Sequence, residues 1–192
     1  MKLETYPDRE FLMLGLANVI AGQLADFLRR EGKASLCVPG GTTPGPIFDT
    51  LSGVDLDWGN VAVFLNDERW VPEDSPRSNT RLLRERLLRG KAAAATLVPL
   101  YAPVDQPEGA LDALAEGIAP HLPVSVLLLG MGADMHTASL FPGADKLEAA
   151  LAAGDVACVL LRFAGPDEGT AKKIVRALLP IAQGHEAALL VE

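Results

Sequence analysis

The chain has 192 residues, 49% of them hydrophobic and 22% charged, which suits one globular domain, residues 1–192, with a sizeable core. The formal net charge of -8 argues against a general nucleic-acid binder, which normally carries a basic stripe. No apolar run approaches the roughly 20 residues that span a bilayer, so we expect a cytoplasmic protein without a membrane partner.

Helical and strand-like segments alternate along the chain. Apolar residues spaced as on a helix face follow Asp8, a candidate N-cap, and predict a first helix. Several later apolar runs are apolar throughout, as in strands buried on both faces of a parallel sheet. We therefore expect a doubly wound, mostly parallel α/β sheet flanked by helices, of Rossmann-like type. The expected strands are residues 35–38, 61–65, 97–100, 124–129, 156–161 and 187–191; the later helices are 46–51, 79–88, 108–121, 146–153 and 170–182.

The two cysteines, Cys37 and Cys158, both lie inside apolar runs. Such placement predicts two buried free thiols and no disulfide. Neither cysteine has the spacing of a zinc site.

In folds of this type ligands bind beyond the carboxyl ends of the strands. The first loop at that edge contains Gly40, Gly41, Thr42 and Thr43. Glycines allow close approach of the backbone, and the start of the next helix offers free N–H groups, so the loop is a candidate phosphate cradle. The same residues also fit a tight turn in which Pro44 starts a helix.

The second loop, residues 66–72, places Asp67, Glu68, Arg69 and Trp70 directly after an apolar strand. Arg69 can bind a phosphate in a bidentate manner, and Asp67 or Glu68 can orient substrate hydroxyls or a cation. The alternative is a solvated charged turn that Trp70 anchors to the core.

The second loop leads to a further helix. Ser78 is its candidate cap, and Arg77 and Arg81 can supplement an anion site. The alternative for both arginines is a solvated position on the helix and its approach.

The third loop delivers His136 at the end of a predicted strand. Histidine titrates near neutrality, so His136 is a candidate general base. Gly130 and Gly132 leave room for a ligand, and Asp134 can orient the imidazole or a substrate hydroxyl. The chain has no Gly-x-Ser-x-Gly elbow, which favours water as the nucleophile. The alternative is a structural histidine on a turn.

Together these loops resemble the 6-phosphogluconolactonase family, within the group that includes glucosamine-6-phosphate deaminases and isomerases. The matching segments are PGGTTP at 39–44, NDERWVP at 66–72 followed by Ser78 and Asn79, and LGMGADMHTASLFPG at 129–143. The resemblance covers most of the chain. Within the group, the residues after the acidic pair and after the histidine look like those of the lactonases.

The resemblance implies hydrolysis of 6-phospho-D-glucono-1,5-lactone to 6-phosphogluconate, with a small-molecule partner and no metal or cofactor. We expect a monomer or a small homo-oligomer. His136 would activate water, Arg69 would stabilise substrate charge, and Asp134 completes the catalytic set. The residues assigned to substrate and phosphate are Gly40, Gly41, Thr42, Thr43, Asp67, Arg77, Asn79, Gly130, Gly132, Lys173 and Arg176.

Three departures from the family pattern keep alternatives open. Met135 stands where the family has glycine, and a left-handed backbone there would cost roughly 1 to 2 kcal/mol. The family's Arg-x-Thr segment is replaced by a stretch in which Lys172, Lys173 and Arg176 are candidate phosphate ligands, with a solvated helix face as the alternative that the pattern favours. The expected domain also lacks the family's last helix. The alternatives are an impaired relative that still binds sugar phosphates, and an enzyme of the deaminase type.

Overall fold

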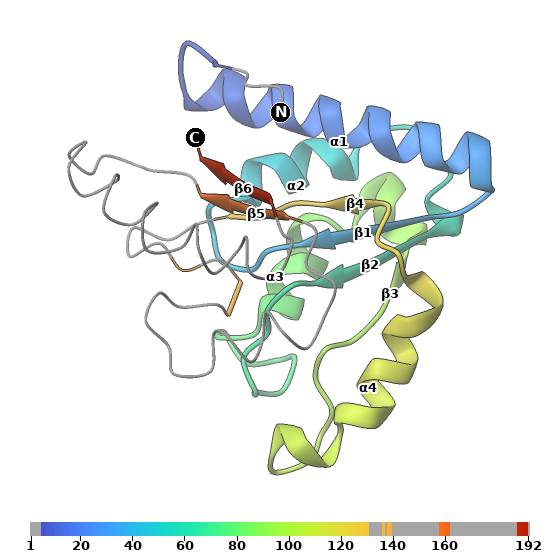
Figure 1. Cartoon of the computed structure of the whole chain (residues 1–192), viewed down its shortest axis with the longest axis vertical. Helices are drawn as coiled ribbons and strands as arrows, with labels where there is room; N and C mark the ends of the chain where they lie inside the picture. The colour runs from blue at the N-terminus through green and yellow to red at the C-terminus, as the bar shows by residue number, and fades with distance from the viewer. Residues whose placement is uncertain (1–4, 131–135, 137, 140–157, 162–187, 192) are drawn as a thin grey trace. The chain divides into compact units, whose positions relative to one another are not determined.

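The computed structural model describes residues 5–130, 136, 138–139, 158–161 and 188–191 (Figure 1). The chain divides into two compact units, Thr5–Leu129 and a second made of Met1–Glu4 with Gly130–Glu192. The first unit carries most of the described residues.

The first helix, α1, spans Arg9–Glu31 and has a defined signal at each end. The Asp8 side chain accepts a hydrogen bond from the N–H of Phe11 at 2.9 Å, as the predicted cap requires. Gly32 ends the helix in the left-handed conformation, with φ of 70°, which glycine adopts without a Cβ penalty. The predicted first helix is confirmed.

Four parallel strands of the first unit form one sheet in the order β3-β2-β1-β4. The two central strands are β1, Ala34–Val38, and β2, Val61–Leu65, and every residue in both is buried. The two flanking strands, β3 at Thr96–Leu97 and β4 at Val126–Leu127, are short. Apolar runs without alternation therefore mark strands that are covered on both faces.

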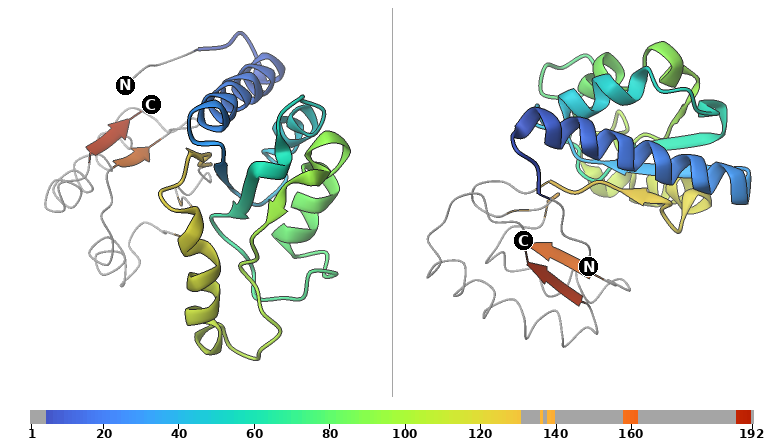
Figure 2. Two further views of the ribbon diagram at one scale, coloured as in Figure 1. Left: turned by 90° about the vertical axis from the view of Figure 1, so that its right-hand side faces the viewer. Right: turned by 90° about the horizontal axis from the view of Figure 1, so that it is seen from above.

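Helices cover both faces of this sheet, as two views show (Figure 2). Alternate residues of β1 and β2 point into a larger core with α1, α2 (Gly45–Ser52) and α3 (Asn79–Arg86). The intervening residues Cys37, Ala62 and Phe64 form a smaller cluster with Val98, against which Ile118 of α4 (Leu111–Ile118) packs. The predicted doubly wound α/β fold is confirmed.

Three predicted elements are shorter than the apolar pattern indicated. Strand β3 stops at Leu97, and Pro99 two residues later has no N–H to extend the pairing. Strand β4 starts only at Val126, because the N–H of Ser125 donates to Oγ of Ser35 at 2.9 Å. The helix predicted over 108–121 is a 3-10 turn at Pro107–Gly109, then α4, then a 3-10 turn at Ala119–His121 that contains a proline.

In the second unit, the described residues include two parallel strands. These are β5, Cys158–Leu161, and β6, Ala188–Val191, which pair in register from Cys158 with Ala188 to Leu161 with Val191. They correspond to the last two predicted strands. The helices predicted at 146–153 and 170–182 lie outside the described residues.

Among the described residues, one helix is long and apolar enough, by length and composition, to cross a membrane. That helix is α1, with a mean hydropathy of 1.6 over 18 residues. The sequence-based expectation of no such run was therefore wrong for this segment. Ala17, Ile20 and Leu24 of α1 are at most 3% exposed and pack in the larger core. A core helix passes the same test, so the finding is weak evidence for a membrane span.

Candidate functional site

The candidate site of the first unit lies at the carboxyl edge of its sheet. Strands β1 and β2 are parallel neighbours, with Val38 opposite Leu65 in the last matched pair. The loops that follow them, 39–44 and 66–72, therefore start side by side. The N–H of Asn66 donates to the carbonyl of Val38 at 2.9 Å and joins the two loops at their origin.

Asn79, at the start of α3, connects the two loops. Its Oδ1 accepts hydrogen bonds from the N–H of Gly41 at 3.3 Å and from Nη1 of Arg69 at 2.9 Å. Its Nδ2 donates to Oδ2 of Asp67 at 3.0 Å and to the Asp67 carbonyl at 3.1 Å. Asn79 is 1% exposed, so its side chain makes these bonds from a buried position. A buried side chain with this many partners is well placed to fix the loops relative to each other.

The Asp67 side chain is hydrogen-bonded to the glycine loop. Its Oδ1 accepts a hydrogen bond from the N–H of Gly40 at 3.2 Å, while its Oδ2 faces Asn79. Both oxygens of Asp67 therefore take part in hydrogen bonds that hold the loop in place.

The Asp67 charge also affects Cys37 on β1. Burial, together with this charge, raises the pKa of the Cys37 thiol to about 12.

Arg69 is held by one of its guanidinium nitrogens. Its Nη1 donates to the carbonyl of Arg77 at 2.7 Å as well as to Asn79. Among the described residues no partner faces Nε or Nη2, and Arg69 as a whole is exposed. This arrangement leaves donors of the fork for an anionic or carbonyl ligand.

The Glu68 carboxylate accepts hydrogen bonds from backbone N–H groups of the protein itself. Its Oε1 accepts from the N–H groups of Arg69 at 2.7 Å and Asn79 at 2.8 Å. Its Oε2 accepts from both the N–H and the hydroxyl of Thr80, each at 2.7 Å, and from the Ser78 hydroxyl at 3.3 Å. Glu68 thus caps the first turn of α3 together with Ser78, whose side chain accepts from Arg81 as predicted. The hypothesis that Glu68 orients substrate is not supported by these contacts.

The remainder of the glycine loop faces outward. Thr42 and Thr43 are exposed, and Gly41 has φ of 76°, a left-handed conformation that suits glycine. Helix α2 follows at Gly45, and no side chain caps its first turn. The expected free N–H groups are largely missing, because Pro44 and Pro46 have no N–H and the N–H of Gly45 donates to the Thr42 carbonyl at 3.2 Å.

The arginines at the entry to α3 differ in their surroundings. The Arg77 side chain is exposed. Arg81 pairs with Glu85 at 2.8 Å and donates to the Asp74 carbonyl at 2.9 Å. Arg81 therefore occupies a solvated helix face, the alternative considered from the sequence.

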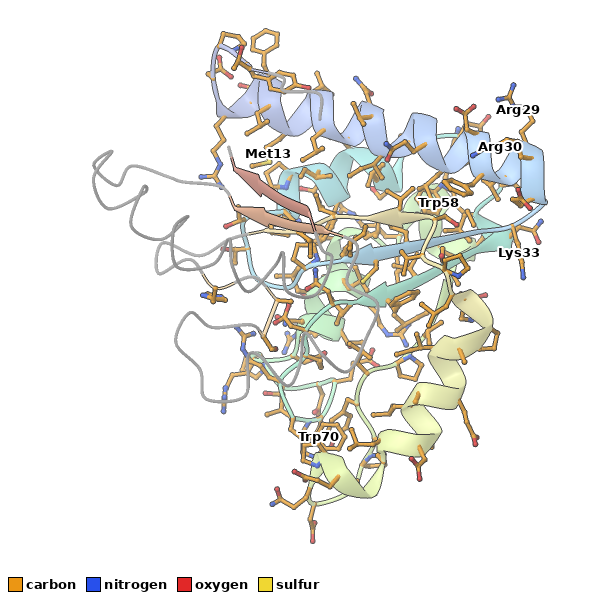
Figure 3. The ribbon with its side chains drawn as sticks, in the orientation of Figure 1. Met13, Arg29, Arg30, Lys33, Trp58 and Trp70 are labelled. Atoms are coloured by element: carbon orange, nitrogen blue, oxygen red, sulfur yellow. The ribbon has the colours of Figure 1, made fainter. Side chains whose placement is uncertain are left out.

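The two tryptophans have different roles. Trp70 donates through Nε1 to the Val104 carbonyl at 2.8 Å and its ring centre lies 5.0 Å from that of Tyr101. Trp70 is therefore bound to the segment around 101–104, whereas Trp58, 1% exposed, lies in the larger core (Figure 3).

The remaining predicted site residues belong to the second unit. Gly130 follows the β4 segment and is exposed, and His136 is half-buried. Ala138, two residues after His136, has φ of 52°, a conformation that L residues rarely adopt. Gly132, Asp134, Met135, Lys173 and Arg176 lie outside the described residues. Of the predicted set, the structure brings together Gly40, Gly41, Asp67, Arg69, Arg77 and Asn79.

Sequence reasoning missed one residue of this edge. Asn66 stands in the motif at 66–72, and the sequence predicts no role for it. Its Nδ2 donates to the carbonyl of Leu128 at 3.1 Å, which links the end of β2 to the segment after β4. The signal for it was its place as the first polar residue after a buried strand.

Open parallel α/β sheets of this class bind ligands beyond the carboxyl ends of their strands, and here a glycine loop, a guanidinium and a carboxylate lie at that edge. Residues 7–191 match the model of the family described as "Glucosamine-6-phosphate isomerases/6-phosphogluconolactonase". The chain belongs to this family.

Individual relatives agree with that membership. The chain is 46% identical over 143 residues to a 6-phosphogluconolactonase of Pseudomonas aeruginosa, covering 71% of this chain and 58% of that protein. It is 38% identical over 192 residues to one of Caulobacter vibrioides, covering 100% of this chain and 81% of that protein. The matches span about three-fifths of the length of several relatives.

Solved structures show the same fold. A 6-phosphogluconolactonase from Shewanella baltica matches with a TM-score of 0.77 and 29% identity, covering 97% of this chain and 94% of that one. A monomeric glucosamine-6-phosphate deaminase matches with a TM-score of 0.66 and 15% identity, covering 100% and 96%. The second likeness concerns the fold alone.

Proposed function

We propose that the chain hydrolyses 6-phospho-D-glucono-1,5-lactone to 6-phosphogluconate in the oxidative pentose phosphate pathway. The observation that carries the proposal is the 46% identity over 143 residues to a protein named 6-phosphogluconolactonase. The cluster around Asn79 supports it, because Asn79 holds the glycine loop and the Arg69 guanidinium together at the edge where such folds bind ligands.

In this proposal the phosphate lies against the glycine loop. The exposed hydroxyls of Thr42 and Thr43 donate to phosphate oxygens. Arg77, with its exposed side chain, adds positive charge near the loop. Gly130 and Gly132 leave space for the sugar, and Lys173 or Arg176 provides a further basic group.

The chemical step is an acyl transfer to water. His136 takes a proton from a water molecule while the oxygen of that water attacks the lactone carbonyl carbon. The resulting oxyanion needs positioned donors, and Arg69 supplies them through the guanidinium nitrogens that Asn79 and Arg77 leave unused. Collapse of the intermediate breaks the ring C–O bond, and the ring oxygen takes the proton back from His136. Asp134 orients the imidazole through this cycle.

We further propose that the protein acts in the cytoplasm, as a monomer or a small homo-oligomer, with the lactone as its small-molecule partner. The proposed chemistry needs neither a metal nor an organic cofactor, because the histidine and water are sufficient for it.

The proposal is tested with freshly prepared lactone. Formation of 6-phosphogluconate is coupled to its dehydrogenase, and the rate is compared with spontaneous opening of the lactone. A rate that rises in proportion to the amount of protein supports the proposal. A rate equal to the spontaneous one, from folded protein, contradicts it. Ammonia release from glucosamine 6-phosphate in a parallel assay would instead indicate the deaminase activity.

A further inference from the structure

The carboxamide of Asn66 has one satisfied end and one unsatisfied end. Its Nδ2 donates to the Leu128 carbonyl at 3.1 Å. Among the described residues, Oδ1 of Asn66 is the buried side-chain polar atom that has no hydrogen-bond partner. The orientation of the amide is fixed, because the Leu128 carbonyl accepts only from the nitrogen end.

This oxygen lies at a particular place in the sheet. Strand β1 has β2 on one side and β4 on the other, and the chain adds β2 and β3 before it returns to β4. The direction of winding therefore reverses between β1 and β4. Asn66 spans the carboxyl end of β1, since its N–H reaches Val38 and its side chain reaches Leu128. Open α/β sheets bind ligands beyond the strands at such a reversal.

A buried acceptor without a donor is rare in folded proteins, and where one occurs in a site it commonly meets a ligand or an ordered water. The partner of Oδ1 must be a hydrogen-bond donor. In 6-phospho-D-glucono-1,5-lactone the ionised phosphate and the carbonyl only accept. The hydroxyls on C2, C3 and C4 are the donors that this substrate offers.

We propose that Oδ1 of Asn66 accepts a hydrogen bond from one ring hydroxyl of the sugar phosphate, which makes Asn66 a specificity-determining residue. This inference rests on the proposed function for the identity of the ligand. A site that hydrogen-bonds a substrate hydroxyl rejects the analogue without it, because the buried protein atom is then left unpaired.

The test measures kcat/KM for the lactone and for its 2-deoxy, 3-deoxy and 4-deoxy analogues. We expect the wild-type protein to lose about tenfold or more on one analogue. Asn66→Leu removes the acceptor at similar volume. For this variant, kcat/KM for that analogue should be almost equal to kcat/KM for the parent lactone. If the substitution acts only through loss of the bond to Leu128, kcat/KM falls by the same factor for all four substrates. The ratios between the analogues and the parent lactone then stay as in the wild-type protein.

Two further variants keep the test interpretable. Asn66→Ala, which is smaller and also has no side-chain acceptor, replaces Asn66→Leu if the leucine variant does not fold. Asn60→Leu is the matched control, because Asn60 is exposed at the other end of β2 and bonds to Asp57 at 2.8 Å. The control should show the wild-type ratios for all analogues.

Equal ratios in the wild-type protein and the Asn66 variants would overturn the inference and assign Oδ1 to a water. Calorimetry with 6-phosphogluconate and its three deoxy derivatives separates this failure from failure of the proposed function. If the lactone is not hydrolysed above its spontaneous rate but one deoxy acid binds more weakly to the wild-type protein only, the contact stands without the activity. Absence of binding to all four acids overturns the inference.

Discussion

Asn79 occupies the space that a side chain at position 40 would need. A Cβ placed on Gly40 would lie 2.1 Å from both Cγ and Nδ2 of Asn79, well inside van der Waals contact. The two residues are 39 positions apart in the sequence, and their close packing brings the glycine loop against the start of α3. Gly40 is required here by close approach.

We expect Gly40→Ala to displace Asn79 and to break its bonds to Gly41 and Arg69. Overpacking of this kind costs typically about 1 to 3 kcal/mol of folding free energy. The activity with the lactone should fall by a larger factor than the stability explains. Urea unfolding and the coupled assay measure the two effects. Gly22→Ala is the matched control, since nothing lies within 4 Å of a Cβ there, and it should be neutral or stabilising.

Glu68→Gln should destabilise the start of α3. The variant keeps one acceptor oxygen but replaces the other by an NH2 group, which faces either the N–H of Asn79 or that of Thr80. Hydrogen bonds to a charged group contribute about 1.5 to 3 kcal/mol, so the free energy of unfolding should drop by an amount of this order. Thermal or urea unfolding measures it. An unchanged midpoint would show that this carboxylate does not support the helix.

Asp49 makes stability depend on pH. Hydrogen bonds from Arg86, with further help from Arg89, hold the pKa of Asp49 below its ordinary value. A carboxylate with a lowered folded-state pKa stabilises the protein above its unfolded pKa of about 3.9, and this contribution is lost as the pH falls further. Asp49→Asn should therefore be less stable than wild type at pH 7, with the difference shrinking toward pH 3.

Urea unfolding at several pH values measures this difference. Asp26→Asn serves as a control, because Asp26 forms an exposed pair with Arg29 on α1 that contributes little. A difference between Asp49→Asn and wild type that stays constant from pH 7 to pH 3 would contradict the assigned pairing.

Cys37 should be chemically inert in the folded protein. Burial, with the Asp67 charge, raises its pKa to about 12, so only about one thiol in ten thousand is ionised at pH 8. In a Cys158→Ser variant, a thiol reagent should react slowly without denaturant and rapidly in urea. Rapid reaction of the native variant would mean that β1 is not the buried central strand.

The sheet could be predicted from local sequence because its central strands are apolar at every position, a pattern typical of strands covered on both faces. The ends of the elements were less predictable. The start of β4 depends on Ser125 bonding to Ser35, which lies 90 positions away. Apolar periodicity contains no information on such a contact.

The site shows the same division between local and distant information. The glycine loop and Arg69 were identified because turn glycines and charges after a buried strand are local signals. The role of Glu68 as a cap for α3 was not identified, because the groups that it caps lie 10 to 12 positions away in the sequence. Asn66 had no signal beyond its place at the strand end, because its partner Leu128 is 62 positions away. The assignment of His136 remains a prediction.

The most direct test of the central claim compares the wild-type protein with His136→Ala. The measurement is lactone hydrolysis above the spontaneous rate, together with calorimetric binding of 6-phosphogluconate. We predict that the variant loses the acceleration but still binds 6-phosphogluconate, since the base acts on water and the glycine loop holds the phosphate. Catalysis that survives in His136→Ala would contradict the assignment of the base and with it the proposed mechanism.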